Sequence, residues 1–383
     1  MTKKEIFKSQ YIKIIFVVLM SFVAIYIRWG LRNIQSPDYV WFLKVWFLQI
    51  KEGGGFLALD TQISNYSPLY IYFLAFLTYL PINSLYSIKI LSVIFDFIGA
   101  YYVFKLLQLK FKYSWITYIG GVITIFLPTV IINGAYAAQC DIIFTTFLIG
   151  TIYYFAKEKN ILALIFFGIA VAFKLQAAFL APLILIFLLK KQIKIWQIII
   201  SPIVYIITLL PAYFIGRPFI DLITIYFKQF GYYPYLTMNC ANIYQFVTEA
   251  HFDLFNKLGI GITFIIVLGI SIWIGTSKKK LNEDIMVEVS MLILIVIPFL
   301  LPQMHERYYF PAELLAIVYA FLNKKYFYIS ITLIFTSFLS YGPFLFGREL
   351  IDMRILAIII FIIIIFLFLD IAEKLKEEIV IEE

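Results

Sequence analysis

The stretch LPQMHERYYFP, residues 301–311, holds the densest group of ionisable side chains in an otherwise apolar part of the chain. It contains one of only two histidines, His305, followed at once by Glu306 and Arg307. The arginine side chain is a planar fork of donors that fits phosphate oxygens, so His305 and Arg307 are candidate phosphate ligands. The alternative is a surface loop whose charges face water, but the aromatic residues 308–310 would place the triplet beside an aromatic wall.

A second candidate is Asp38, which follows Pro37 in the short stretch SPDY. A carboxylate beside aromatic residues suits a general base that takes a proton from a hydroxyl group. The alternative interpretation is structural, because Ser36 or Asp38 can cap the first turn of the helix that follows.

Further polar residues interrupt apolar runs. Lys174 and Gln176 lie inside one long run, where an ionisable residue marks a functional site unless its side chain reaches the membrane interface. Gln139 and Asp141 stand at an expected helix start, where Asp141 can cap backbone amides, meet a sugar hydroxyl or, with Asp38, hold a divalent metal. The remaining candidates for sugar or acceptor contacts are Tyr39, Asn65, Tyr66, Asn239, Asn242, Glu306 and Tyr308.

The elements that must position these residues are membrane helices. Of the 383 residues, 63% are hydrophobic and only 14% are charged, and apolar runs of bilayer-spanning length recur from end to end. We therefore expect an all-α, polytopic transmembrane helical bundle with about 11–13 membrane segments, formed by residues 1–383 as a single domain. The two cysteines allow neither a disulfide framework nor a metal cluster.

The net charge of +8 reports membrane topology and does not indicate a nucleic-acid partner. Lysines cluster in short loops, as is typical of the cytoplasmic side, whereas all six arginines lie outside those clusters. The first apolar segment is too long for a signal peptide and is expected to stay as a helix that starts in the cytoplasm. Residues 32–67 and 216–257 then form outer loops, and the aromatic-rich stretch DYVWFLKVWFLQI in the first is expected to be an interfacial helix that ends at Gly53.

Two segments do not fit strict alternation across the membrane. Residues 68–82 form the shortest apolar segment and are expected to take an interfacial or re-entrant path. Residues 160–189 carry Lys174, Gln176 and Pro182 near their middle and are expected to form two half-helices. The polar stretches then converge on the outer side, which predicts a cavity that opens there.

Four motifs, in order, carry a resemblance to a known class: SPDY, NYSPLYIYF, NGAYAAQCD with the later FKLQ, and LPQMHERYYFP. They span residues 36–313 and resemble the GT-C class of membrane glycosyltransferases, in particular bacterial relatives of the second mannosyltransferase of GPI-anchor assembly. In the stretch AQCD, Ala138 stands where that family usually has glycine.

The resemblance implies transfer of a sugar, with inversion, from a polyprenyl-phosphate carrier on the outer leaflet. It implies Asp38 as the general base, with Lys174, His305 and Arg307 stabilising the phosphate. The hexose, mannose at first guess, would go to a cell-envelope glycan or glycolipid acceptor, and the composition suits a bacterial plasma membrane. The polyprenyl-phosphate sugar is then a substrate and no separate cofactor is implied, while Asp38 and Asp141 are the residues that would hold a divalent metal if one takes part. The competing interpretation is a flippase or a polymerase of lipid-linked saccharides, but flippases often show repeat-like halves, which are absent here.

Overall fold

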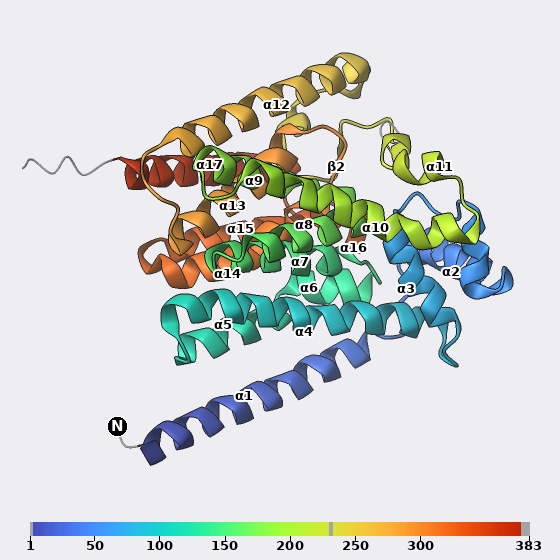
Figure 1. The fold of residues 1–383 in the computed structure, drawn as a ribbon, viewed down its shortest axis with the longest axis horizontal. Coiled ribbons are helices and arrows are strands. Elements are labelled where there is room, and N and C mark those ends of the chain that lie inside the picture. The colour runs from blue at the N-terminus through green and yellow to red at the C-terminus, as the bar shows by residue number, and fades with distance from the viewer. Residues whose placement is uncertain (1–2, 230–232, 377–383) are drawn as a thin grey trace, which may run out of the picture. The chain divides into compact units, whose positions relative to one another are not determined.

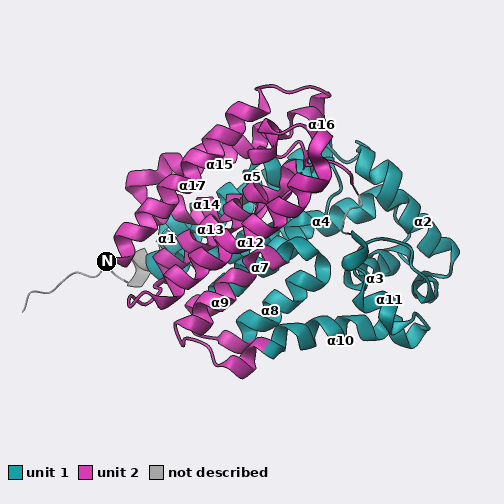
Figure 2. Ribbon diagram, turned by 90° about the horizontal axis from the view of Figure 1, so that it is seen from above, with its two compact units in different colours: residues 1–153, 162–177, 199–232 teal, residues 154–161, 178–198, 233–383 magenta. Residues whose placement is uncertain are grey.

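The computed structural model describes residues 3–229 and 233–376, which fold almost entirely as helices. Figure 1 shows these helices, and Figure 2 colours the two compact units into which the chain divides. Unit 1 comprises residues 1–153, 162–177 and 199–232, and unit 2 comprises residues 154–161, 178–198 and 233–383. The expected all-α fold is therefore confirmed, while the expected single domain stays a prediction.

Unit 1 is built from the N-terminal helices and from two helices that return later in the chain. Its α-helices are α1 (Lys3–Gly30), α2 (Lys44–Glu52), α3 (Pro68–Thr78), α4 (Ser84–Phe111), α5 (Trp115–Phe126), α6 (Pro128–Ile131), most of α7 (Asp141–Ala156) and α8 (Asn160–Phe173), α10 (Ile200–Ile215) and α11 (Phe219–Ile223). Two π-helical segments, η1 (Tyr39–Leu43) and η3 (Ile132–Tyr136), belong to it as well. Within this unit α4 packs along α5, and α5 packs against α1 (Figure 1).

Unit 2 contains the C-terminal helices and the one small sheet of the described residues. Its α-helices are α9 (Ala181–Leu189), α12 (Phe252–Thr276), α13 (Glu283–Leu300), α14 (Phe310–Leu322), α15 (Phe327–Ser340), α16 (Gly342–Phe346) and α17 (Met353–Leu375). The strands β1 (Thr237–Met238) and β2 (Met304–His305) pair in parallel. Helix α13 is buried over nearly its whole length, between α12, α14 and α17.

Among the described residues, six helices are long and apolar enough to cross a membrane. They cover Ser9–Gly30, Ser84–Phe111, Ile195–Ile215, Glu249–Thr276, Lys324–Phe346 and Met353–Leu375. A seventh crossing is possible if α5 and the segment Pro128–Tyr136, which are bent by 47° at their junction, act together. This number is lower than the 11–13 membrane segments predicted from the sequence. The difference arises because several apolar runs form helices shorter than a bilayer crossing, such as α3 and α7.

The irregular segments follow the expected breaks. Residues 39–52 are helical, and the helix ends before Gly54 and Gly55, which both have positive φ angles. Helix α3 has only 11 residues, so it is too short to span a bilayer in a single crossing. The long segment from residue 160 is interrupted after Phe173, and a 3₁₀ turn (Leu175–Leu180) separates α8 from α9.

A buried ion pair ties α1 to α4 inside unit 1. Arg28 donates from Nε to Asp96 Oδ2 at 2.8 Å, and both side chains are almost fully buried. The same guanidinium donates through Nη2 to the carbonyl oxygen of Ile125 at 2.8 Å. Ile125 lies in the last turn of α5, where carbonyl groups lack partners within the helix, so Arg28 satisfies one of them.

We predict that Asp96→Leu lowers the free energy of unfolding by about 3–5 kcal/mol, because it leaves the Arg28 charge buried without its partner. The double variant Arg28→Met/Asp96→Leu should recover much of this loss, since both charges are then replaced by apolar groups. Thermal unfolding in detergent measures both effects. Equal losses in the single and double variants would contradict the prediction.

Candidate functional site

Asp38 lies half-buried just before η1. The sequence left open whether Ser36 or Asp38 caps this helix, and the contacts of the two side chains differ. The hydroxyl of Ser36 accepts a hydrogen bond from the amide of Tyr39 at 3.1 Å and donates to the carbonyl of Ala137 at 2.7 Å. Asp38 makes no side-chain cap, and its Oδ2 instead accepts from the side-chain amide of Gln139. The serine is therefore the cap, and the Asp38 carboxylate accepts a hydrogen bond from the AQCD stretch.

The position of Gln139 depends on a turn at the end of η3. Gln139 N donates to the carbonyl of Asn133 at 2.8 Å, and Ala138 N donates to the carbonyl of Gly134 at 3.1 Å. This pair of bonds is the Schellman ending of a helix, which requires a left-handed residue at the position of Ala138. Ala138 has a φ of 60° and is fully buried. A left-handed backbone favours glycine, which would account for the glycine that the resemblance implies here, and in this chain alanine adopts that conformation.

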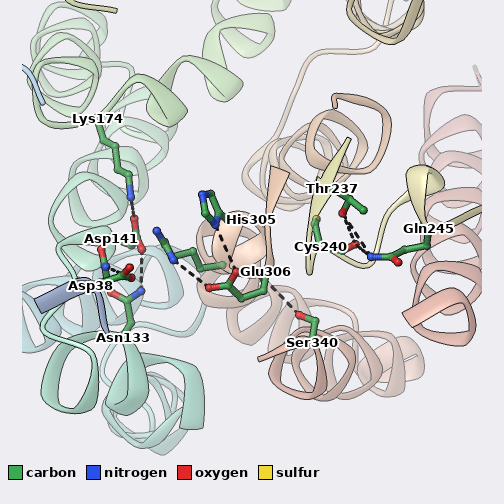
Figure 3. Close-up of polar contacts among 12 residues, drawn as sticks. Asp38, Asn133, Asp141, Lys174, Thr237, Cys240, Gln245, His305, Glu306 and Ser340 are labelled. Atoms are coloured by element: carbon green, nitrogen blue, oxygen red, sulfur yellow. Dashed lines mark hydrogen bonds and ion pairs between the residues drawn. The ribbon is translucent and has the colours of Figure 1, made fainter. Parts of the chain in front are cut away.

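Asp141 begins α7 and pairs with the lysine at the break after α8. Lys174 Nζ contacts Asp141 Oδ1, and Asn133 Nδ2 donates to Asp141 Oδ2 at 2.8 Å (Figure 3). The side chains of Lys174 and Asp141 are only 7% and 2% exposed. The Lys174 ammonium also lies 5.7 Å from the ring centre of Tyr66 and 5.9 Å from that of Phe144. The interruption after α8 thus places the Lys174 ammonium beside the buried Asp141 carboxylate and near two aromatic rings.

Three buried polar residues on α4, which we call the α4 polar stripe, hold the segments that carry these side chains. They are Lys89, Ser92 and Asp96, spaced so that they share one helix face. Lys89 Nζ donates to the carbonyls of Leu31 at 2.8 Å and Ile34 at 2.7 Å, just before the SPDY stretch. Ser92 Oγ donates to the carbonyl of Gln139 at 2.7 Å. The stripe therefore positions both partners of the Asp38–Gln139 contact.

In unit 2 the His305-Glu306-Arg307 triplet forms an ionic cluster around the middle residue. Glu306 accepts from Arg307 Nη1 at 3.0 Å, and His305 Nδ1 lies 3.6 Å from its other oxygen (Figure 3). Burial alone would raise the pKa of Glu306, but Arg307 and His305 outweigh it and hold that pKa below its usual value. Glu306 is therefore ionised at neutral pH and fixes the two cationic candidates beside it.

The second loop expected outside meets this triplet through its backbone. Strand β1 pairs Met238 with His305, and Asn239, with a φ of 60°, forms a further bridge to His305. Asn242 is fully buried, accepts from Tyr244 N at 3.1 Å and donates to the carbonyl of Pro298 at 3.5 Å. Residues 238–242 (MNCAN) thus lie beside residues 305–307, which we call the HER triplet, within unit 2.

The other residues proposed for sugar or acceptor contacts lie in both units. Tyr39 is buried, with its hydroxyl 2.8 Å from that of Ser84, and Tyr66 packs its ring against Trp46 and Tyr70. Asn65 and Gln176 are half-buried in unit 1, and in unit 2 the ring of Tyr308 contacts those of Phe179 and His305. A contact between any of them and a sugar stays a prediction.

Sequence analysis did not identify Asn133, Ser92 or Lys89 as parts of the site. Asn133 precedes Asp141 by eight residues, and only the turn at Ala138 brings the two side chains together. Ser92 and Lys89 bond to backbone carbonyls, which carry no sequence signal. Among the described residues, no group of three or more His, Cys, Asp or Glu side chains is placed to hold a metal ion.

Residues 65–220 match the family model described as dolichyl-phosphate-mannose-protein mannosyltransferase. The match covers less than half of the chain and includes Tyr66, Gln139, Asp141 and Lys174, but neither Asp38 nor the HER triplet. No curated protein matches the chain. Together with the apolar helices, the family match supports an integral membrane glycosyltransferase of the GT-C type that uses a lipid-phosphate-linked sugar.

We predict that Ala138→Gly keeps the fold and the transferase activity, whereas Ala138→Val loses both in part. Glycine removes the free-energy cost of about 1–2 kcal/mol for an L side chain in the left-handed region, but it also loses about 0.8 kcal/mol from burial of the methyl group. The free energy of unfolding of the glycine variant should therefore equal or exceed that of the parent. A β-branched residue at this φ is strained and would move Gln139. Thermal unfolding in detergent together with a transfer assay tests both variants, and a tolerated valine would contradict the explanation.

We predict a pH-dependent cost for Glu306→Gln. The pKa of Glu306 is lower in the folded state than in the unfolded state. The stability that its ionised carboxylate contributes is therefore complete above the usual carboxyl pKa of about 4.3, and it disappears as the pH falls through the lower pKa of the folded state. The variant should therefore be less stable by about 2–3 kcal/mol at pH 7, with a difference that shrinks in acid. The exposed Glu283→Gln serves as the control for thermal melts across that range. A pH-independent difference would exclude the ionic explanation.

Proposed function

We propose that this protein is an inverting glycosyltransferase that moves a hexose, mannose at first guess, from a polyprenyl-phosphate donor to a cell-envelope glycan or glycolipid. The reaction would take place on the outer face of a bacterial plasma membrane. The observation that carries the proposal is the half-buried Asp38 carboxylate, held by the amide of Gln139 within a network that also contains the Asp141–Lys174 pair. The family match over residues 65–220 supports the donor class.

In this proposal Asp38 takes the proton of the acceptor hydroxyl. The hydroxyl oxygen forms a bond to the anomeric carbon from the face opposite the phosphate, and the bond from that carbon to the phosphate oxygen breaks. The polyprenyl phosphate leaves with the electron pair, and the configuration at the carbon inverts. The side-chain amide of Gln139 suits this task, because its hydrogen bond to Asp38 Oδ2 orients the carboxylate.

The leaving phosphate requires fixed positive charge at the moment of bond cleavage. We assign this role to Lys174, which pairs with Asp141, and to His305 and Arg307, which Glu306 holds in place. Prepositioned cations of this kind stabilise developing charge without reorganising during the reaction. Sugar and acceptor contacts are assigned to Tyr39, Asn65, Tyr66, Gln139, Asp141, Gln176, Asn239, Asn242 and Tyr308. A divalent metal at Asp38 and Asp141 is not needed for this scheme.

We predict that Asp38→Asn lowers the transfer rate by about 10²–10⁴-fold while the protein still folds, because the amide cannot accept the proton. The matched control is Asp60→Asn, which changes an exposed carboxylate in the same loop and should leave the rate unchanged. The assay uses purified protein in liposomes with a panel of polyprenyl-phosphate sugars and measures release of polyprenyl phosphate. If no donor is consumed and lipid-linked sugars cross the bilayer equally with both variants, the protein is a flippase.

A further inference from the structure

A cavity that contains none of the candidate site residues lies where three helix ends of unit 1 meet. Its volume is about 320 Å³, and it lies between the start of α1, the end of α4 and the start of α5. The residues that line it are Ser9, Gln10, Lys13, Phe111, Lys112, Tyr113 and Ser114. None of them takes part in the proposed transfer reaction, so the cavity needs a separate explanation.

The described lining is basic, with two lysines and no acidic side chain. Lys13 is buried, at 8% exposure, although it lies one turn inside the first membrane helix. Its Nζ donates to the carbonyl of Tyr113 at 2.7 Å and lies about 6 Å from the rings of Trp115 and Tyr118. A lysine ammonium has three donors, and none of the residues that line the cavity carries a carboxylate. A buried cation to which the described lining offers no counter-charge favours an anionic ligand.

A hydroxyl group in the same cavity also lacks a partner within the described part of the chain. Ser114 occupies the cap position of α5, but its side chain accepts no amide of the first turn. Its Oγ is buried and forms no hydrogen bond with any described residue. Such a group costs about 1–3 kcal/mol unless a ligand or water satisfies it. Oxygen atoms of a phosphate would satisfy this hydroxyl and Lys13 together.

The surroundings of the cavity are those of a bilayer surface. In the same turns of α1 as the lining residues, Tyr11, Ile12 and Ile15 are exposed, at 62%, 49% and 55%. Tyr113 and Trp115 are also largely exposed, and such aromatic side chains are typical of the membrane interface. A lipid could therefore place its headgroup in the cavity and its acyl chains along the apolar face of α1. A free phosphate would use only the polar part of this site.

We propose that this cavity binds the phosphate of an anionic phospholipid, in the leaflet at the N-terminal end of α1. The distribution of short lysine-rich loops makes that the cytoplasmic leaflet, opposite the proposed transfer reaction. Basic pockets between membrane helices on this side recognise acidic headgroups. The site would anchor the ends of α1, α4 and α5, independently of which substrate the protein uses.

The test compares lipid binding by the parent protein and by Lys13→Gln/Lys112→Gln. Delipidated protein is titrated with phosphatidylglycerol, with phosphatidylcholine and with inorganic phosphate, and bound lipid is counted by native mass spectrometry alongside thermal shifts. We expect phosphatidylglycerol to bind most tightly and the double variant to bind it about 25-fold more weakly, at about fivefold for each lysine. The control, Lys110→Gln/Lys157→Gln, removes the same charge from exposed positions outside the cavity and should change binding less than twofold.

Three results would overturn the proposal. Equal weakening in the control variant would show general charge attraction. Equal binding of phosphatidylcholine would show that the anionic headgroup is not recognised. Stabilisation by inorganic phosphate that phosphatidylglycerol does not exceed would assign the site to a soluble anion. If Lys13→Gln prevents folding, Lys112→Gln/Ser114→Ala provides the same comparison while the buried lysine stays in place.

Discussion

A charge inside an apolar helix bundle must have a partner, and in this protein that requirement determines where the segments of unit 1 lie. Helix α4 supplies the main fixed points through Lys89, Ser92 and Asp96. Lys89 reaches the residues that follow α1, Ser92 reaches the AQCD stretch, and Asp96 reaches Arg28 in the last turn of α1. Because the three share one helix face, these segments cannot shift independently. The carboxylate of Asp38 thus owes its position to a helix that contributes no reacting group.

The carboxylates of Asp38 and Asp141 are both fixed by side chains from neighbouring segments. Asp38 Oδ2 accepts from the side-chain amide of Gln139, and Asp141 pairs with the ammonium of Lys174. A hydrogen bond from an amide orients a carboxylate, whereas an ion pair also holds the cation in place. In the proposed reaction these two contacts serve two tasks, the orientation of the base and the retention of a fixed cation. The HER triplet follows the second pattern, with Glu306 between His305 and Arg307.

The membrane helices were predictable because apolar runs and breaks depend on local composition, and the interruption at Lys174 was expected from the charge itself. The stretches around Asp38, Gln139 and Lys174 were also predicted to be parts of one site. Their pairing was not predictable, because it depends on the path of the chain through the turn at Ala138. The contacts of Lys89 could not be predicted from the sequence, for another reason. Their acceptors are main-chain carbonyls, which every residue has, so nothing in the sequence distinguishes Leu31 and Ile34 from their neighbours.

The left-handed turn at Ala138 also bears on how such proteins are recognised in genomes. A search pattern that demands glycine before Gln-x-Asp would reject this chain, although its backbone makes the turn that the glycine serves. The requirement is conformational, so the pattern should admit residues that tolerate a left-handed backbone and should exclude the β-branched ones. Membrane enzymes whose motif differs by this one methyl group would then be grouped with their relatives and no longer missed.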